Sequence, residues 1–116
     1  ALEEYLSPTL DALALEVAFT RFITESPLPI FADFYAEWCA PCLQMMPVLA
    51  QLAEQKGTVL RVVKVDVNKF TPLITKYPVG GVPTLMLFDK GKMIWNRPGI
   101  CSLAEMQGIL KEQLSL

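Results

Sequence analysis

The segment Ile30–Tyr35, with the sequence IFADFY, is apolar at every position except Asp33. A run that is this short, continuous and aromatic favours a strand buried on both faces, as strands are in parallel sheets. Both faces of such a sheet are covered by helices, so this one segment already indicates an α/β protein.

The residues before this strand fit a helix less clearly. Ser7-Pro8 is a plausible helix start, because a capping side chain precedes a proline at the first helical position. The apolar spacing over Leu10–Ile23 suits an amphipathic helix. A short strand near Thr9–Leu13 followed by a helix from about Leu15 is the alternative. Residues 1–7 are expected to be a loose end.

Helix and strand patterns alternate over the rest of the chain. Helices are predicted over Leu43–Lys56, which Gly57 ends, over Lys69–Tyr77, which contains Pro72, and after a capping box formed by Ser102 and Glu105. Strands are predicted over Thr58–Val67, Pro83–Phe88 and Lys92–Arg97, the last two joined as an antiparallel hairpin by a short link that contains glycine. This order predicts an α/β sandwich of helices and a largely parallel sheet.

Composition limits the classes of partner. The chain has 116 residues, of which 53% are hydrophobic and 19% charged, so we expect one folded domain over residues 1–116. The formal net charge is −2 and no basic patch stands out, which argues against nucleic acid as a partner. No apolar run approaches the ~20 residues that span a bilayer, so no membrane association is expected. We see no leader and expect a cytoplasmic protein, or a periplasmic or organellar one if a leader was cleaved before Ala1.

Two of the three cysteines, Cys39 and Cys42, stand three residues apart between the strand and the next helix. They could be a structural staple, part of a metal site or a redox pair. The chain has no histidine, which removes Cys–His and Ser–His–Asp catalysis and the mixed zinc sites. A closed zinc site needs four ligands and only Cys101 remains as a further thiol, so no metal is expected.

The spacing favours redox chemistry. Residues i and i+3 on a helix lie roughly 5–6 Å apart at Cβ, so a small adjustment can make or break the bond. The closed loop is too small to stabilise the fold much. Unpaired N–H groups at a helix start stabilise negative charge on Cys39, which makes it the candidate nucleophile. Cys42 would then be the resolving thiol, and Pro41 suits the first helical turn.

The quoted motifs now point to a family. DFYAEWCAPC, the later GGVPT over Gly80–Thr84, VVKVDV and the final PG resemble the thioredoxin family over about Pro29 to Leu114. The resemblance implies the thioredoxin fold, a central mixed sheet of parallel strands plus an antiparallel hairpin, flanked by helices. It implies a monomeric protein-disulfide reductase with a redox-active disulfide and no bound cofactor. Its partners would be disulfide-containing client proteins and a recycling reductase, and the resemblance implies that a thioredoxin reductase supplies the electrons.

The resemblance also assigns roles. Asp33 would be a buried acid and base for Cys42, Lys64 would neighbour and tune it, and Pro83 would follow a cis peptide bond. An Asp33 at a solvent-facing strand end, an exposed strand Lys64 and a Trp38 in the core are the simpler alternatives. Cys101 is expected to be inert, with a regulatory thiol as the alternative. The substrate-binding residues would be Trp38, Ala40, Pro41, Gly81, Val82, Gly99 and Ile100.

The dipeptide between the cysteines indicates whether the protein acts as a reductant or as an oxidant. Ala40 and Pro41 offer no charge to stabilise a reduced thiolate, which favours a reductant over a strong oxidant. A reductase or isomerase outside the cytoplasm, and a binding or assembly module with this fold, remain alternatives.

Overall fold

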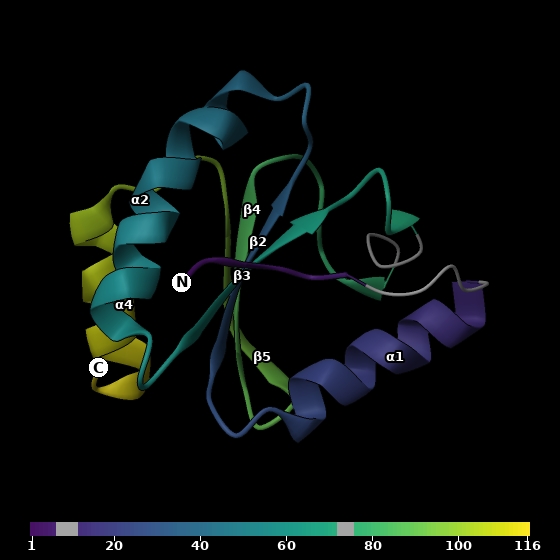
Figure 1. Ribbon diagram of the computed structural model, residues 1–116, viewed down its shortest axis with the longest axis horizontal. Coiled ribbons are helices and arrows are strands. Elements are labelled where there is room, and N and C mark those ends of the chain that lie inside the picture. The colour runs from purple at the N-terminus through teal and green to yellow at the C-terminus, as the bar shows by residue number, and fades with distance from the viewer. Residues whose placement is uncertain (7–11, 72–75) are drawn as a thin grey trace.

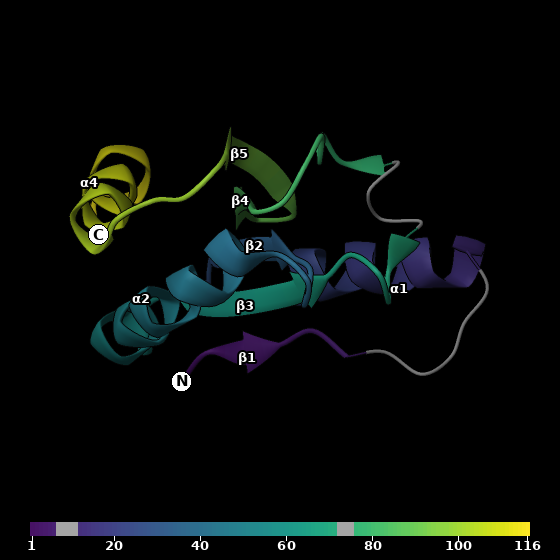
Figure 2. The ribbon, with the colours of Figure 1, turned by 90° about the horizontal axis from the view of Figure 1, so that it is seen from above.

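The computed structural model describes residues 1–6, 12–71 and 76–116, which form a central sheet with helices on both faces (Figure 1). The strands run in the order β1-β3-β2-β4-β5, which can be followed from edge to edge in Figure 2. Their bounds are β1 Glu3–Glu4, β2 Ile30–Tyr35, β3 Arg61–Asp66, β4 Thr84–Asp89 and β5 Lys92–Pro98, and those of the helices are α1 Ala12–Glu25, α2 Ala40–Lys56 and α4 Leu103–Leu114.

The sheet is mixed. Strand β3 pairs in parallel with β1 and β2, whereas β4 is antiparallel to both β2 and β5. All six residues of β2 are buried, as the apolar run predicted. Lys90 and Gly91 have positive φ, 53° and 80°, which is the backbone of a tight two-residue hairpin turn. The predicted α/β architecture with an antiparallel hairpin is confirmed.

Each face of the sheet has its own core. Helix α1 packs Leu15, Phe19 and Ile23 against one face, while α2 and α4 cover the other face side by side. Side chains alternate between faces along a strand, so Phe31 of β2 points to the α2 and α4 side and Asp33, two residues on, points to the same side. The capping box predicted at Ser102 and Glu105 is present at the start of α4.

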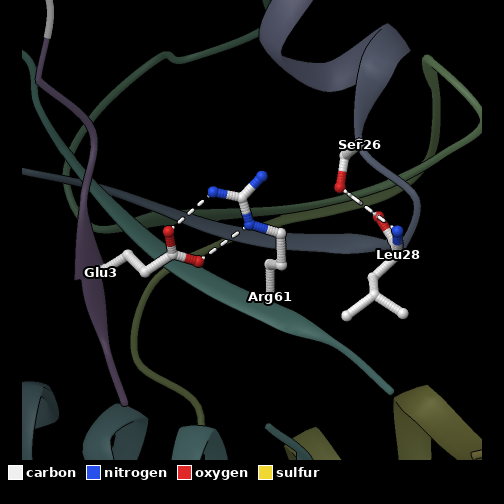
Figure 3. A network of polar contacts seen from close by, with 4 residues as sticks. All are labelled: Glu3, Ser26, Leu28 and Arg61. Atoms are coloured by element: carbon white, nitrogen blue, oxygen red, sulfur yellow. Dashed lines mark hydrogen bonds and ion pairs between the residues drawn. The ribbon is translucent and has the colours of Figure 1, made fainter. Parts of the chain in front are cut away.

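The start of the chain departs from the prediction. Residues 1–6 are not a loose end, because Glu3 and Glu4 form β1 and Tyr5 is buried against Phe19 and Phe70. A two-residue strand made of two glutamates carries no apolar periodicity, so its pattern resembled a solvated tail. The Arg61 guanidinium donates two hydrogen bonds to the Glu3 carboxylate, at 2.9 and 2.7 Å (Figure 3). Charge pairing across strands therefore docks this segment.

Other boundaries moved by a few residues. Helix α2 begins at Ala40 and not at Leu43, because Cys39 caps it. The alternative strand near Thr9–Leu13 is wrong for Ala12 and Leu13, which lie in α1, while its earlier residues lie outside the described part. Two other predictions lie outside the described residues. They are the helix start at Ser7-Pro8 and the centre of the helix predicted over Lys69–Tyr77, which includes Pro72.

The Glu3–Arg61 pair gives a stability prediction. We expect Glu3→Gln to lower the free energy of unfolding by about 0.5–1 kcal/mol, because the ion pair is bidentate and only partly exposed. The matched control is Glu25→Gln, whose pair with Arg21 lies fully on the surface of α1 and should contribute almost nothing. Urea unfolding of both variants makes the comparison, and equal effects would contradict the docking role of Glu3.

Candidate active site

The two cysteines lie where β2 ends and α2 begins. Cys39 occupies the N-cap position of α2 with extended backbone angles, φ −91° and ψ 104°. Its sulfur accepts a hydrogen bond from the backbone N–H of Cys42 at 3.3 Å. Pro41, in the first turn, lacks an N–H that would have been unpaired there. A sulfur thus takes the place that a serine or aspartate oxygen usually fills at a helix start.

Cys39 and Cys42 form a disulfide, with their Cα atoms 5.3 Å apart. Cys39 is 5% exposed and Cys42 is fully buried, so Cys39 is the sulfur closer to solvent. The Val82–Pro83 peptide bond is cis, as the resemblance implied, and the Val82 carbonyl oxygen lies 3.7 Å from the Cys39 sulfur. The loop at residues 80–83 therefore lies against the outer sulfur.

Asp33 is fully buried and neither of its carboxylate oxygens has a hydrogen-bond partner in the structure. The simpler alternative, a solvent-facing strand end, is therefore wrong. Burial raises the pKa of the Asp33 carboxyl from its ordinary 3.8 to about 7, and the positive charge of Lys64 partly opposes that rise. The group can consequently hold or release a proton near neutral pH.

Lys64 is the neighbour of Asp33 in the sheet register. Its ammonium does not form an ion pair with Asp33 but lies 3.4 Å from the Glu4 carboxylate of β1. The side chain is half-buried and also lies over the Tyr35 ring, so it is not a simple exposed lysine. Sequence reasoning missed Glu4 here because it expected residues 1–7 to be loose.

The predicted substrate-binding residues near the Cys39 sulfur differ in their exposure and in the pockets that they line. Trp38 is 72% exposed and Ile100 61%, so the alternative that Trp38 packs in the core is wrong. A shallow pocket of about 210 Å³ is lined by Trp38, Val67, Val79, Gly80, Gly81 and Val82. Ala40 and Pro41 are exposed on the first turn of α2, and Gly99 has a φ of 88°, which favours glycine. A second pocket, of about 320 Å³, lies between Pro41 and Ile100.

The third cysteine differs from the pair. Cys101 is free and 4% exposed, and burial raises the pKa of its thiol, which disfavours the reactive thiolate. The inert role expected from the sequence stays a prediction, and this buried environment is consistent with it. Within residues 1–6, 12–71 and 76–116, no group of three or more His, Cys, Asp or Glu side chains is placed to hold a metal ion. No helix in that described part is both long and apolar enough to cross a bilayer.

A capped, disulfide-forming cysteine pair at the end of a central strand defines the class of thiol–disulfide oxidoreductases. Comparison with known proteins makes the assignment specific. Residues 12–112 match the sequence model of the family described as Thioredoxin, and this chain belongs to the thioredoxin family.

Individual proteins of the thioredoxin family are similar to this chain over most of their length. A thioredoxin-like protein of Synechocystis is 35% identical over 76% of this chain and 84% of that protein. A thioredoxin of Acidithiobacillus ferridurans is 37% identical over 84% of this chain and 90% of its own length. Among solved structures, a mutant thioredoxin of Halobacterium salinarum superposes with a TM-score of 0.80 at 28% identity, covering 99% of this chain and 92% of that one. The family and the cysteine pair together support thiol–disulfide oxidoreductase activity.

Proposed function

We propose that this chain reduces disulfide bonds in client proteins. The observation that carries the proposal is the position of Cys39: its sulfur caps α2 and accepts the Cys42 N–H, so the helix start favours negative charge on that atom once the disulfide is reduced. The thiolate is the nucleophile in disulfide exchange.

The reaction takes place in two exchanges. The Cys39 thiolate attacks one sulfur of the client disulfide, forms a Cys39–client bond and expels the other client sulfur as a thiolate. Cys42 loses its proton and attacks the Cys39 sulfur, which releases the second client sulfur and leaves the Cys39–Cys42 disulfide. Two electrons have then passed from the cysteine pair to the client. A recycling reductase must return two electrons to close the cycle.

Asp33 is the proposed acid and base for this cycle. Its carboxyl lies on the sheet face that α2 covers and changes protonation near neutral pH. It would accept the Cys42 proton, through water, during resolution and return it on re-reduction. Lys64 would limit the rise of the Asp33 pKa by stabilising the carboxylate form.

The client would lie over the outer sulfur. Val82, which the cis bond sets against Cys39, offers backbone groups to an extended client segment, and exposed Trp38 and Ile100 offer apolar surface. Ala40, Pro41, Gly81 and Gly99 complete that surface. We further propose that the chain acts as a monomer in the cytoplasm, with the periplasm or an organelle as the alternative compartment.

The reduction potential tests the direction of electron flow. We expect a potential below that of the cytosolic glutathione couple, which biochemical extraction places at roughly −220 to −260 mV, because Ala40 and Pro41 add no charge that would stabilise the reduced form. Equilibration of the purified protein in glutathione buffers of graded ratio, read by thiol alkylation and mass, gives the value. A reduction potential near or above that of the glutathione couple would overturn the assignment as a reductant and favour an oxidase or isomerase.

A further inference from the structure

A row of charged side chains crosses half of the sheet. In the strand register Glu4 of β1 lies opposite Lys64 of β3, and Lys64 lies opposite Asp33 of β2. Register partners place their side chains on the same face of a sheet, so all three lie on the face that α2 and α4 cover. The row runs from the sheet edge, where Glu4 is half-exposed, to the centre, where Asp33 is fully buried.

Lys64, the middle residue of this row, pairs with Glu4 at the β1 edge of the sheet. The Lys64 ammonium lies 3.4 Å from one Glu4 oxygen, and Lys69 approaches the other at 3.5 Å. Neither oxygen of Asp33 has a partner, although Lys64 is the positive charge that acts on it. Glu4 and Asp33 thus compete for one cation, and the structure shows Glu4 holding it.

We propose that Glu4 is a positioning residue of the redox site, which holds Lys64 toward the sheet edge and so controls how strongly Lys64 stabilises the Asp33 carboxylate. The proposal rests on the proposed function only for its consequence in turnover. Without Glu4, Lys64 would carry an uncompensated charge and would turn its full attraction on Asp33.

No other charged group near the row can replace Lys64 as the link between Glu4 and Asp33. The acidic neighbours of this region are Asp66 of β3 and Glu37 after β2. Tyr35 of β2 stays neutral, because burial, with Glu4 and other acidic groups nearby, raises its pKa to about 12. Among residues 1–6, 12–71 and 76–116, Lys69 is the one further cation that pairs with Glu4. The first turns of α2, from Ala40 to Ala50, carry no charged side chain. Lys64 is therefore the route by which Glu4 reaches Asp33.

The test is a carboxyl NMR titration of Asp33 in the oxidised protein, which needs no turnover. We expect Glu4→Gln to lower the Asp33 pKa by about half a unit, the size of a partly exposed ion pair. The matched control is Glu3→Gln. Glu3 lies next along β1 but pairs with Arg61 on the opposite sheet face (Figure 3), so its loss should leave the Asp33 pKa unchanged.

The second measurement tests whether Glu4 acts on the Asp33 pKa through Lys64. Lys64→Met should raise the Asp33 pKa, and in that background Glu4→Gln should produce less than half of its original shift. Amide exchange of Tyr5, whose N–H donates to the Lys64 carbonyl oxygen, reports whether β1 stays docked. Equal shifts from Glu3→Gln and Glu4→Gln, no shift from Glu4→Gln, or a full shift in the Lys64→Met background would each overturn the proposal.

The kinetic arm separates this proposal from the proposed function. If the chain reduces client disulfides, the pH–rate limb that belongs to Asp33 should move to lower pH in Glu4→Gln by the same half unit. A wild-type chain without reductase activity would defeat the proposed function, while the NMR titration would still decide whether Glu4 acts on Asp33.

Discussion

Cys39→Ser is expected to abolish disulfide reduction, and Cys42→Ser is expected to stop after the first exchange with the client still attached. A serine hydroxyl does not attack disulfide sulfur, so without Cys39 no covalent step begins. With Cys42 replaced, nothing displaces the client from Cys39. Insulin reduction followed by turbidity measures the first effect, and non-reducing electrophoresis with intact mass of the adduct measures the second.

The remaining thiol supplies the control. Cys101→Ser should retain wild-type turnover, because Cys101 is buried and free, and burial raises the pKa of its thiol. Turnover by Cys39→Ser would contradict the assignment of the nucleophile. Loss of turnover in vitro with unchanged cellular function would instead favour the alternative of a binding or assembly module, in which Trp38 and Ile100 hold a partner without chemistry.

The second large effect is a fall in stability between pH 4 and pH 7. The Asp33 carboxyl has a pKa of about 7 in the folded protein and an ordinary value of 3.8 when unfolded. Between these values the folded state binds the extra proton, so raising the pH favours the unfolded state. A difference of about three units corresponds to roughly 4 kcal/mol of unfolding free energy, which is lost as the pH rises from about 4 through the folded pKa of about 7.

Urea unfolding of the oxidised protein at several pH values measures this slope. The difference between wild type and Asp33→Asn isolates Asp33 from other carboxyl groups, such as Glu3 and Glu105, whose pKa values are lowered and whose stabilisation is lost only under more acidic conditions. Asp33→Asn should gain relative to wild type by roughly 4 kcal/mol from pH 4 to pH 8. Parallel curves for the two proteins would show that Asp33 is ionised throughout this range.

Local signals explain the parts of the fold that the sequence predicted. An unbroken apolar run specified β2, a short glycine-containing link specified the β4–β5 turn, and Ser102 with Glu105 specified the start of α4. Each of these depends on neighbours within a few residues. The spacing of Cys39 and Cys42 behind a buried strand likewise predicted their placement at a helix start.

Features that depend on distant partners were not predictable. Strand β1 pairs with β3, and the basic partners of Glu3 and Glu4 lie about sixty positions later in the chain. The unpaired state of the Asp33 oxygens depends on how separate strands and helices assemble. No pattern within one segment reports such contacts. The sequence therefore predicted the buried acid Asp33 but not Glu4, which we propose acts on Asp33 through Lys64.

The sulfur cap of α2 ties the chemistry of this chain to its architecture. An electrophile that modifies Cys39 converts an atom able to carry negative charge into a neutral thioether at the first turn of the helix. Covalent inhibitors aimed at this thiol would therefore do more than block the nucleophile, because they would also loosen the element that presents it.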